Sequence, residues 1–107
     1  MNLPFPIQAY FDADNRNDGL ALIQAFAPDA VLRDEGRSYA GHQVIDAWWR
    51  GVKLKYRQAI EPLTVVEKDA VTSVRARVTG QFPGSPAMLT FAFRLEGDQI
   101  THLEIGA

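Results

Sequence analysis

The spacing of apolar residues changes near Gln58, and this change constrains the fold more than any other feature of the sequence. Before Gln58, apolar residues recur mostly at helical spacing. After it, they mostly alternate with polar residues, as in strands that bury one face. The segment 70–80 shows this most clearly, since Val74, Ala76 and Val78 point one way and the arginines between them point the other. Helices followed by a meander of strands is the order of an α+β domain.

The first half of the chain carries signals for three helices. Pro4 and Pro6 suit the first turn of a helix, where a missing backbone N–H does no harm. Asp18 can cap a second helix, and Pro28 disfavours its continuation. The pattern predicts helices at 4–14, 20–26 and 41–55, short strands at 30–32 and 38–40, and longer strands at 59–67, 70–80, 87–96 and 99–105.

Composition narrows the class of protein. The chain has 107 residues, no cysteine, and 11 basic against 13 acidic residues, so we expect one domain spanning residues 1–107, without disulfides, thiolate metal sites or a cysteine nucleophile. The basic residues are scattered, which argues against nucleic-acid binding, and no apolar run is long enough for a membrane span. His42 and His102 lack metal-ligand spacing, so we expect no metal site. We also expect a cytoplasmic location.

Two segments carry a resemblance to a known family. Residues 26–51 read FAPDAVLRDEGRSYAGHQVIDAWWRG, and residues 91–105 read FAFRLEGDQITHLEI. In order and spacing they resemble the SnoaL-like and ketosteroid-isomerase-like members of the nuclear transport factor 2-like superfamily, and with the first helix the resemblance covers essentially the whole chain. It implies a strongly curved, mainly antiparallel sheet wrapped around three helices, which forms a cone with an apolar pocket. It also implies a homodimer through the outer face of the sheet.

The resemblance further implies two catalytic residues. Tyr10 lies where the isomerase-like members have a tyrosine that donates a hydrogen bond to the substrate oxygen. Asp34, which is 24 positions later, lies where they have the general base. Phe91 stands where these members have a second, acidic oxyanion donor, which is a departure from their pattern. The implied reaction is proton transfer next to a carbonyl, as in isomerisation or aldol-type cyclisation, and it needs no cofactor.

The residues themselves leave alternatives open. Strand alternation places Asp34 on the same face as Ala30 and Leu32, but an aspartate before Glu-Gly is also ordinary turn chemistry. Tyr10 equally suits a core position with its hydroxyl at the rim. If Asp34 does lie in an apolar pocket, desolvation raises its pKa toward values useful for proton abstraction near neutral pH.

Other residues are candidates for the pocket wall. Trp48 and Trp49 are adjacent on a helix and therefore point about 100° apart. We expect one of them in the core and the other at the pocket mouth or an interface. The predicted wall residues are Trp48, Trp49, Phe91, Phe26, Leu32 and His42. For His42 a plain surface position is the alternative.

Two functional hypotheses follow from the sequence. In the first, the pocket binds a small apolar carbonyl compound and isomerises or cyclises it. In the second, the chain is a non-catalytic module that binds a ligand or a protein partner, because one fold can host both kinds of function. The pair Tyr10 and Asp34 favours the first hypothesis, and the departure at Phe91 favours the second.

Overall fold

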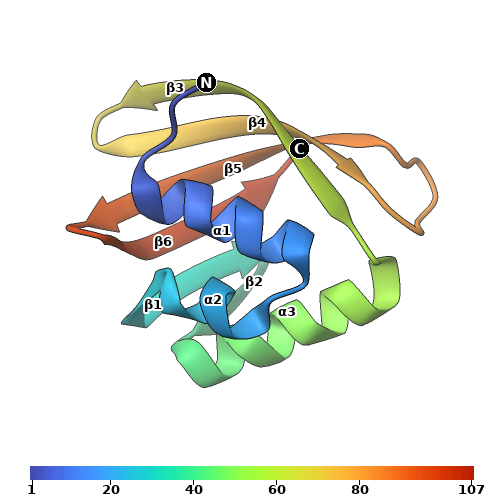
Figure 1. The fold of residues 1–107 in the computed structure, drawn as a ribbon, viewed down its shortest axis with the longest axis horizontal. Coiled ribbons are helices and arrows are strands. Elements are labelled where there is room, and N and C mark those ends of the chain that lie inside the picture. The colour runs from blue at the N-terminus through green and yellow to red at the C-terminus, as the bar shows by residue number, and fades with distance from the viewer.

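Three helices cover one face of a curved, open six-stranded sheet in the computed structural model, which describes residues 1–107 (Figure 1). The elements are α1 (Phe5–Arg16), α2 (Gly19–Gln24), β1 (Phe26–Asp34), β2 (Arg37–Ala40), α3 (His42–Tyr56), β3 (Ala59–Lys68), β4 (Val71–Thr79), β5 (Ala87–Glu96) and β6 (Gln99–Gly106). The strand order is β2-β1-β6-β5-β4-β3. Neighbouring strands are antiparallel except for β1 and β6, which are parallel. The α+β prediction is confirmed.

The boundary between α2 and β1 differs from the sequence prediction. The second helix ends at Gln24, whereas helical spacing placed Phe26 in it. Phe26 instead opens β1 and pairs with Ile100 of β6, and the backbone N–H of Ile100 donates to the carbonyl of Ala25 at 2.8 Å. Strand pairing therefore overrides the local helical pattern. The predicted cap is confirmed, because the Asp18 side chain accepts a hydrogen bond from the Ala21 N–H at 3.1 Å.

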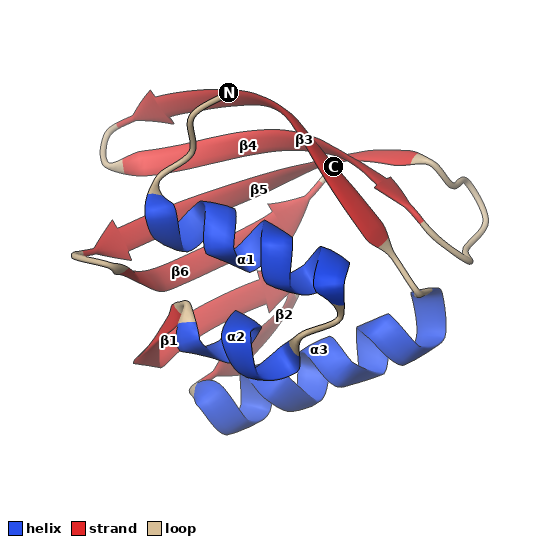
Figure 2. Ribbon diagram, in the orientation of Figure 1, coloured by secondary structure: helices blue, strands red, loops and turns tan.

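The core is a cluster of aromatic rings between α1 and β5. Tyr10 and Phe11 of α1 lie edge-on to Phe93 at centroid distances of 5.8 Å. Phe91 lies 5.3 Å from Phe11 and 6.3 Å from Tyr10. Phe26 adds a further edge contact to Tyr10 at 5.8 Å. Figure 2 shows α1 lying along the sheet in front of β5 and β6, which is the arrangement these contacts hold in place.

A side chain of α1 also ties the helix to the edge strand β3. Asn15 donates from Nδ2 to the carbonyl of Ile60 and accepts from the N–H of the same residue, each at 2.8 Å. The amide thus pairs with the Ile60 backbone much as a neighbouring strand would. None of the helices combines the length and apolar character that crossing a membrane requires.

The opposite face of the sheet is open. Along β3 and β5 the residues that alternate with the buried ones include Val66 and Met88, which are 63% and 39% exposed. On the same face Arg77 pairs with Glu61 at 2.6 Å, and Arg75 donates to Thr90 at 2.9 Å. This face therefore mixes apolar and charged side chains.

The aromatic cluster predicts how stability responds to truncation. Phe93 is fully buried, so Phe93→Ala should lower the free energy of unfolding by about 3–5 kcal/mol. Phe5 is 77% exposed, and Phe5→Ala should change it by less than about 0.5 kcal/mol. Urea unfolding followed by circular dichroism measures both variants. If both variants lost the same free energy of unfolding, Phe93 would not be packed in the core more closely than Phe5.

Candidate functional site

A cavity of about 480 Å³ opens between the helices and the sheet. It is bounded by α1, α3, the end of β1, the strands β3 to β6, and the loop between β4 and β5. Eleven of its fifteen lining residues are hydrophobic, so a largely apolar molecule would be stabilised by burial there. The lining residues are Tyr10, Asp34, Glu35, Trp48, Val52, Tyr56, Gln58, Ile60, Val78, Phe82, Pro83, Ala87, Leu89, Phe91 and Ile105.

Asp34 reaches the cavity because it ends β1 on the inward side of the sheet. It lies beside Ile105 of β6, which in turn pairs with Phe91 of β5. The three side chains therefore form one inward row across neighbouring strands. Trp48 of α3 donates from Nε1 to the Asp34 Oδ2 at 3.1 Å, which fixes the carboxylate from the helix side. The backbone of Glu35 also hydrogen-bonds this carboxyl, and Asp34 lines the cavity.

The surroundings of Asp34 change its acidity. Desolvation by burial raises the pKa of its carboxyl above the usual value, and the neighbouring charge of Glu35 adds to the rise. The hydrogen bonds from Trp48 and from the Glu35 backbone act in the opposite direction. A carboxylate with a raised pKa is a stronger base than an exposed aspartate, which suits it to accept a proton from carbon.

Tyr10 of α1 lines the same cavity. Its side chain is 1% exposed within the aromatic cluster. Burial raises the pKa of the phenol well above its usual value, and the charges of Asp14 and Asp34 raise it further. The hydroxyl therefore keeps its proton and is free to donate it in a hydrogen bond to a ligand oxygen.

Three residues that the sequence analysis did not place in the wall complete it: Val52, Tyr56 and Phe82. Val52 and Tyr56 follow the predicted Trp48 in a stripe at intervals of four along α3, and all three line the cavity. Phe82, from the loop between β4 and β5, lies edge-on to Tyr56 at a centroid distance of 5.7 Å. The stripe was visible as helical spacing, whereas nothing local in the Pro- and Gly-containing loop marks Phe82 as a wall residue.

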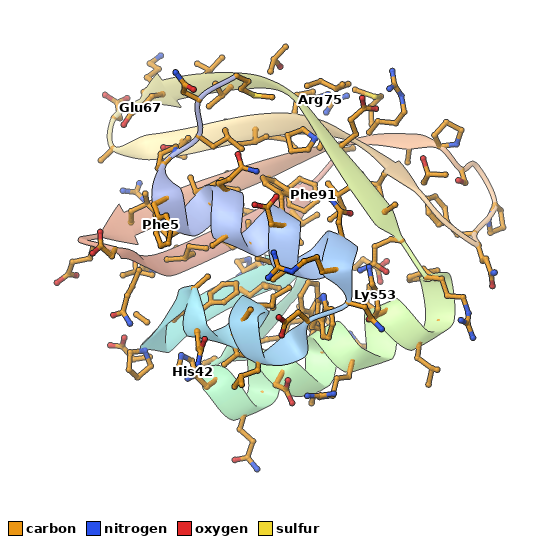
Figure 3. The ribbon with its side chains drawn as sticks, in the orientation of Figure 1. Phe5, His42, Lys53, Glu67, Arg75 and Phe91 are labelled. Atoms are coloured by element: carbon orange, nitrogen blue, oxygen red, sulfur yellow. The ribbon has the colours of Figure 1, made fainter.

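Of the predicted wall residues, Trp48 and Phe91 line the cavity and four do not. Phe26 and Leu32 are fully buried in the core beneath it. Trp49 turns the other way from Trp48 and donates to the buried Asp14. His42 bonds through Nε2 to the Phe26 carbonyl at 2.8 Å, and Figure 3 shows it at the end of α3 remote from Lys53. The pocket assignment from sequence is corrected at these four positions.

A second polar cluster lies behind the cavity. Asp14 of α1 is fully buried and accepts hydrogen bonds from Trp49 Nε1 at 2.8 Å and Gln58 Nε2 at 3.1 Å. Lys53 lies 3.3 Å from its other oxygen. Burial raises the pKa of Asp14, while these three partners lower it. No group of three or more His, Asp or Glu side chains is arranged to hold a metal ion.

Comparison with known proteins agrees with this geometry. Residues 7–103 match the SnoaL-like domain. The chain belongs to the SnoaL-like domain family. Among proteins with curated descriptions, none matches this SnoaL-like chain significantly.

Solved structures support the same assignment. A Sinorhizobium meliloti protein with the provisional name polyketide cyclase shares 44% identity and a TM-score of 0.93, over 96% of this chain and 94% of its own. A Catenulispora acidiphila protein with a ketosteroid isomerase-like fold has 18% identity and a TM-score of 0.85, over 99% and 87%. A Xanthomonas campestris protein, also provisionally named a polyketide cyclase, has 22% identity and a TM-score of 0.77, over 94% and 85%. The last two show the fold alone.

The raised pKa of Asp34 predicts how the stability of this SnoaL-like domain depends on pH. The folded state holds the Asp34 proton more tightly than the unfolded state does, so this contribution to stability is full below the unfolded pKa, about 4, and is lost as pH rises through the folded pKa. Asparagine has no titratable carboxyl group, so the Asp34→Asn variant does not lose stability in this way as pH rises. Relative to wild type, the variant should therefore gain stability as pH rises from about 4 to 7.

Urea unfolding of both proteins across that pH range measures the difference. Asp29→Asn, at an exposed position of β1, is the matched control and should show no such trend. The opposite result would be a wild type whose free energy of unfolding rises with pH relative to that of Asp34→Asn. It would mean that folding stabilises the Asp34 carboxylate rather than desolvating it.

Proposed function

We propose that the cavity binds a small, neutral, largely apolar carbonyl compound and transfers a proton at the carbon next to the carbonyl. The single observation that carries the proposal is that Asp34 and Tyr10, a base and a hydrogen-bond donor from different elements, line the same apolar cavity. Proton abstraction needs a base at the carbon and a donor at the oxygen, where negative charge develops.

The charges of the wall favour a neutral ligand. Asp34 and Glu35 are the only charged residues that line the cavity, and no lysine, arginine or histidine joins them. A ligand carboxylate or phosphate would lose its hydration there without gaining a cationic partner. An anionic substrate is therefore disfavoured, and a ketone, ester or other uncharged carbonyl compound is favoured.

Each residue has a distinct role in the proposed step. Asp34 removes the α-proton, and the electron pair of the broken C–H bond moves into the carbonyl to give an enolate. Tyr10 donates a hydrogen bond to the enolate oxygen. The Trp48 N–H donates to Oδ2 and holds the carboxylate in the cavity wall. The enolate then takes the proton back from Asp34 at another carbon of the conjugated system. Alternatively, it attacks a second carbonyl of the ligand to close a ring, and the alkoxide that forms takes the proton from Asp34.

The relative from Sinorhizobium meliloti supports a cyclase-like version of this chemistry. Its provisional name is polyketide cyclase, and its similarity to this chain extends over nearly the full length of both. Ring closure by an enolate starts with the same proton abstraction as isomerisation, so the same two residues would serve both reactions. We place the protein in the cytoplasm in this proposal.

A non-catalytic module that binds a ligand or a protein partner is the alternative. Phe91 favours it, because this apolar ring lies in the cavity wall where the isomerase-like members have an acidic donor. The exposed Val66 and Met88 on the open face of the sheet favour it as well, since they could pack against a second copy of the chain. The two functions are not exclusive, because that face lies across the sheet from the cavity.

Exchange of α-protons for deuterium tests the catalytic proposal. Wild-type protein in D₂O should accelerate exchange at the α-carbon of 1-tetralone, a neutral bicyclic ketone, and proton NMR measures the rate. Asp34→Asn should reduce the acceleration by about 10²–10⁴-fold, as expected for loss of a general base. Tyr10→Phe should reduce it by about 10²–10³-fold, as expected for loss of an oxyanion donor.

Two conservative substitutions outside the cavity serve as controls. Asp29→Asn removes an exposed carboxylate of the same strand, and Tyr39→Phe removes a phenol that packs on Trp48 outside the cavity lining. Both should exchange tetralone protons at the wild-type rate. Binding of tetralone without any exchange by wild type would favour the ligand-binding alternative.

The open face of the sheet yields a separate expectation. We expect a homodimer formed through this face, with Val66 and Met88 in the contact. Val66→Glu would place a charge there and should convert the dimer to a monomer, as measured by sedimentation velocity. Leu54→Glu, at a 76% exposed position of α3, is the control and should leave the dimer intact. A wild-type protein that sediments as a monomer would contradict this part of the proposal.

A further inference from the structure

Phe82 lies in the loop between β4 and β5 and contributes to the cavity wall. Its ring packs edge-on against Tyr56 at a centroid distance of 5.7 Å, and Tyr56 lines the cavity as well. Phe82 is half-buried and packs against the hydrophobic core, although the loop around it is mostly exposed. A turn needs no aromatic ring, so the inward position of Phe82 points to a role in the cavity.

Hydrogen bonds fix this loop against the end of α3. The Gln81 N–H donates to the Tyr56 carbonyl at 2.7 Å, and Figure 1 shows the loop and this end of α3 on the same side of the molecule. Within the loop, the Gly80 N–H donates to Ser85 Oγ at 3.0 Å, and the Ser85 N–H donates to the Phe82 carbonyl at 3.2 Å. A Cβ at Gly80 would lie 2.7 Å from the Tyr56 carbonyl oxygen, so the close approach requires glycine.

The helical wall places Phe82 at the opposite end of the cavity from Asp34. Trp48 donates to Asp34, whereas Tyr56, about two turns later on α3, contacts Phe82. The eight residue steps from Trp48 to Tyr56 span about 12 Å of helix at about 1.5 Å per residue. The carboxylate and the Phe82 ring are therefore held by opposite ends of the wall stripe of α3.

The sheet wall gives the same order. Asp34 pairs with Ile105, and Ile105 pairs with Phe91 of β5. From Phe91 the cavity wall continues through Leu89 to Ala87, where β5 begins after the loop. The four residue steps from Phe91 to Ala87 span about 13 Å of strand at about 3.3 Å per residue. Sheet and helix thus agree that the loop lies at the end of the cavity remote from the carboxylate.

We propose that Phe82 is a specificity-determining residue that sets the length of the ligand. The inference rests on the proposed function, because it takes the reacting carbonyl to lie between Asp34 and Tyr10. The rest of the ligand then extends along the α3 stripe and ends at the Phe82 ring. Side chains at both ends occupy part of the length between them. The favoured ligand is therefore a compact bicyclic carbonyl compound, and a further ring in line would meet Phe82.

Two ketones of different length test the inference. Isothermal titration calorimetry gives the dissociation constants of 1-tetralone and 6-phenyl-1-tetralone for wild type and for Phe82→Ala. In wild type the added phenyl ring should not tighten binding, because the Phe82 ring occupies its place. In Phe82→Ala the cavity is longer, and the phenyl ring should tighten binding about 10- to 100-fold, as expected for burial of one aromatic ring.

Two variants control for indirect effects. Gln81→Ala changes the neighbouring loop residue, whose exposed side chain does not line the cavity. Phe5→Ala removes the same side chain as Phe82→Ala, at an exposed position of α1. Both should keep the wild-type ratio of the two dissociation constants. Tighter binding of the phenyl compound by wild type or by either control, or no such gain in Phe82→Ala, would overturn the inference.

A measurement on wild type alone covers the case in which Phe82→Ala does not fold. With 1-tetralone bound, the aromatic protons remote from the carbonyl should show nuclear Overhauser effects to the Phe82 ring. The methylene next to the carbonyl should show them to the methyl groups of Ile105, which lies beside Asp34. The reverse pattern, or no contact with Phe82, means that the ligand does not end at this ring and contradicts the inference.

Deuterium exchange of the same ketones separates this inference from the proposed function. Exchange without an effect of ligand length on binding would contradict the role of Phe82 alone. An effect of length without exchange would contradict proton transfer alone. If neither ketone bound to any of the proteins, both the inference and the proposed function would be wrong.

Discussion

The buried carboxylate of Asp14 is the interaction on which the arrangement of the site depends. It joins α1 to α3 through Trp49 and Lys53, and to the start of β3 through Gln58. Removing one partner from a buried, hydrogen-bonded charge destabilises a protein by about 3–5 kcal/mol, so these elements are held in a narrow range of relative positions. Tyr10 lies one turn before Asp14 on α1, so its place relative to the α3 wall depends on this junction.

The fold could be predicted from the sequence because its main signals are local. Alternation along 70–80 and 87–96 identified strands, and helical spacing identified α1 and α3. The end of α2 could not be predicted in the same way. Phe26 fits the helical spacing of its neighbours, and only its pairing with Ile100, more than seventy residues later, places it in a strand. Local periodicity holds no information about such a distant partner.

The site could be predicted only in part, for a related reason. The adjacent tryptophans predicted that one faces the core and the other the pocket mouth or an interface, but both are apolar aromatic residues, so the sequence could not say which. Trp48 faces Asp34 and Trp49 faces Asp14 because each indole N–H points toward a carboxylate from another element. Phe82 and Gln58 join the wall through chain segments that meet only in the folded protein. Tyr10 and Asp34 were identified through the resemblance to the isomerase-like members, because residues at the matching positions of those proteins act in one site.

The unfavourable features of this domain are concentrated at the cavity. Elsewhere the core is closely packed aromatic and aliphatic side chains. The carboxyl of Asp14 is also desolvated, but three partners, Trp49, Lys53 and Gln58, offset part of that cost. At the cavity wall lie the desolvated carboxyl of Asp34 and the phenol of Tyr10. Desolvation of the Asp34 carboxylate lowers the stability of the empty protein, and a ligand group that donates a hydrogen bond to it would offset this cost. Locally unfavourable features are expected to cluster at a functional site, because selection there acts on binding or catalysis rather than on stability.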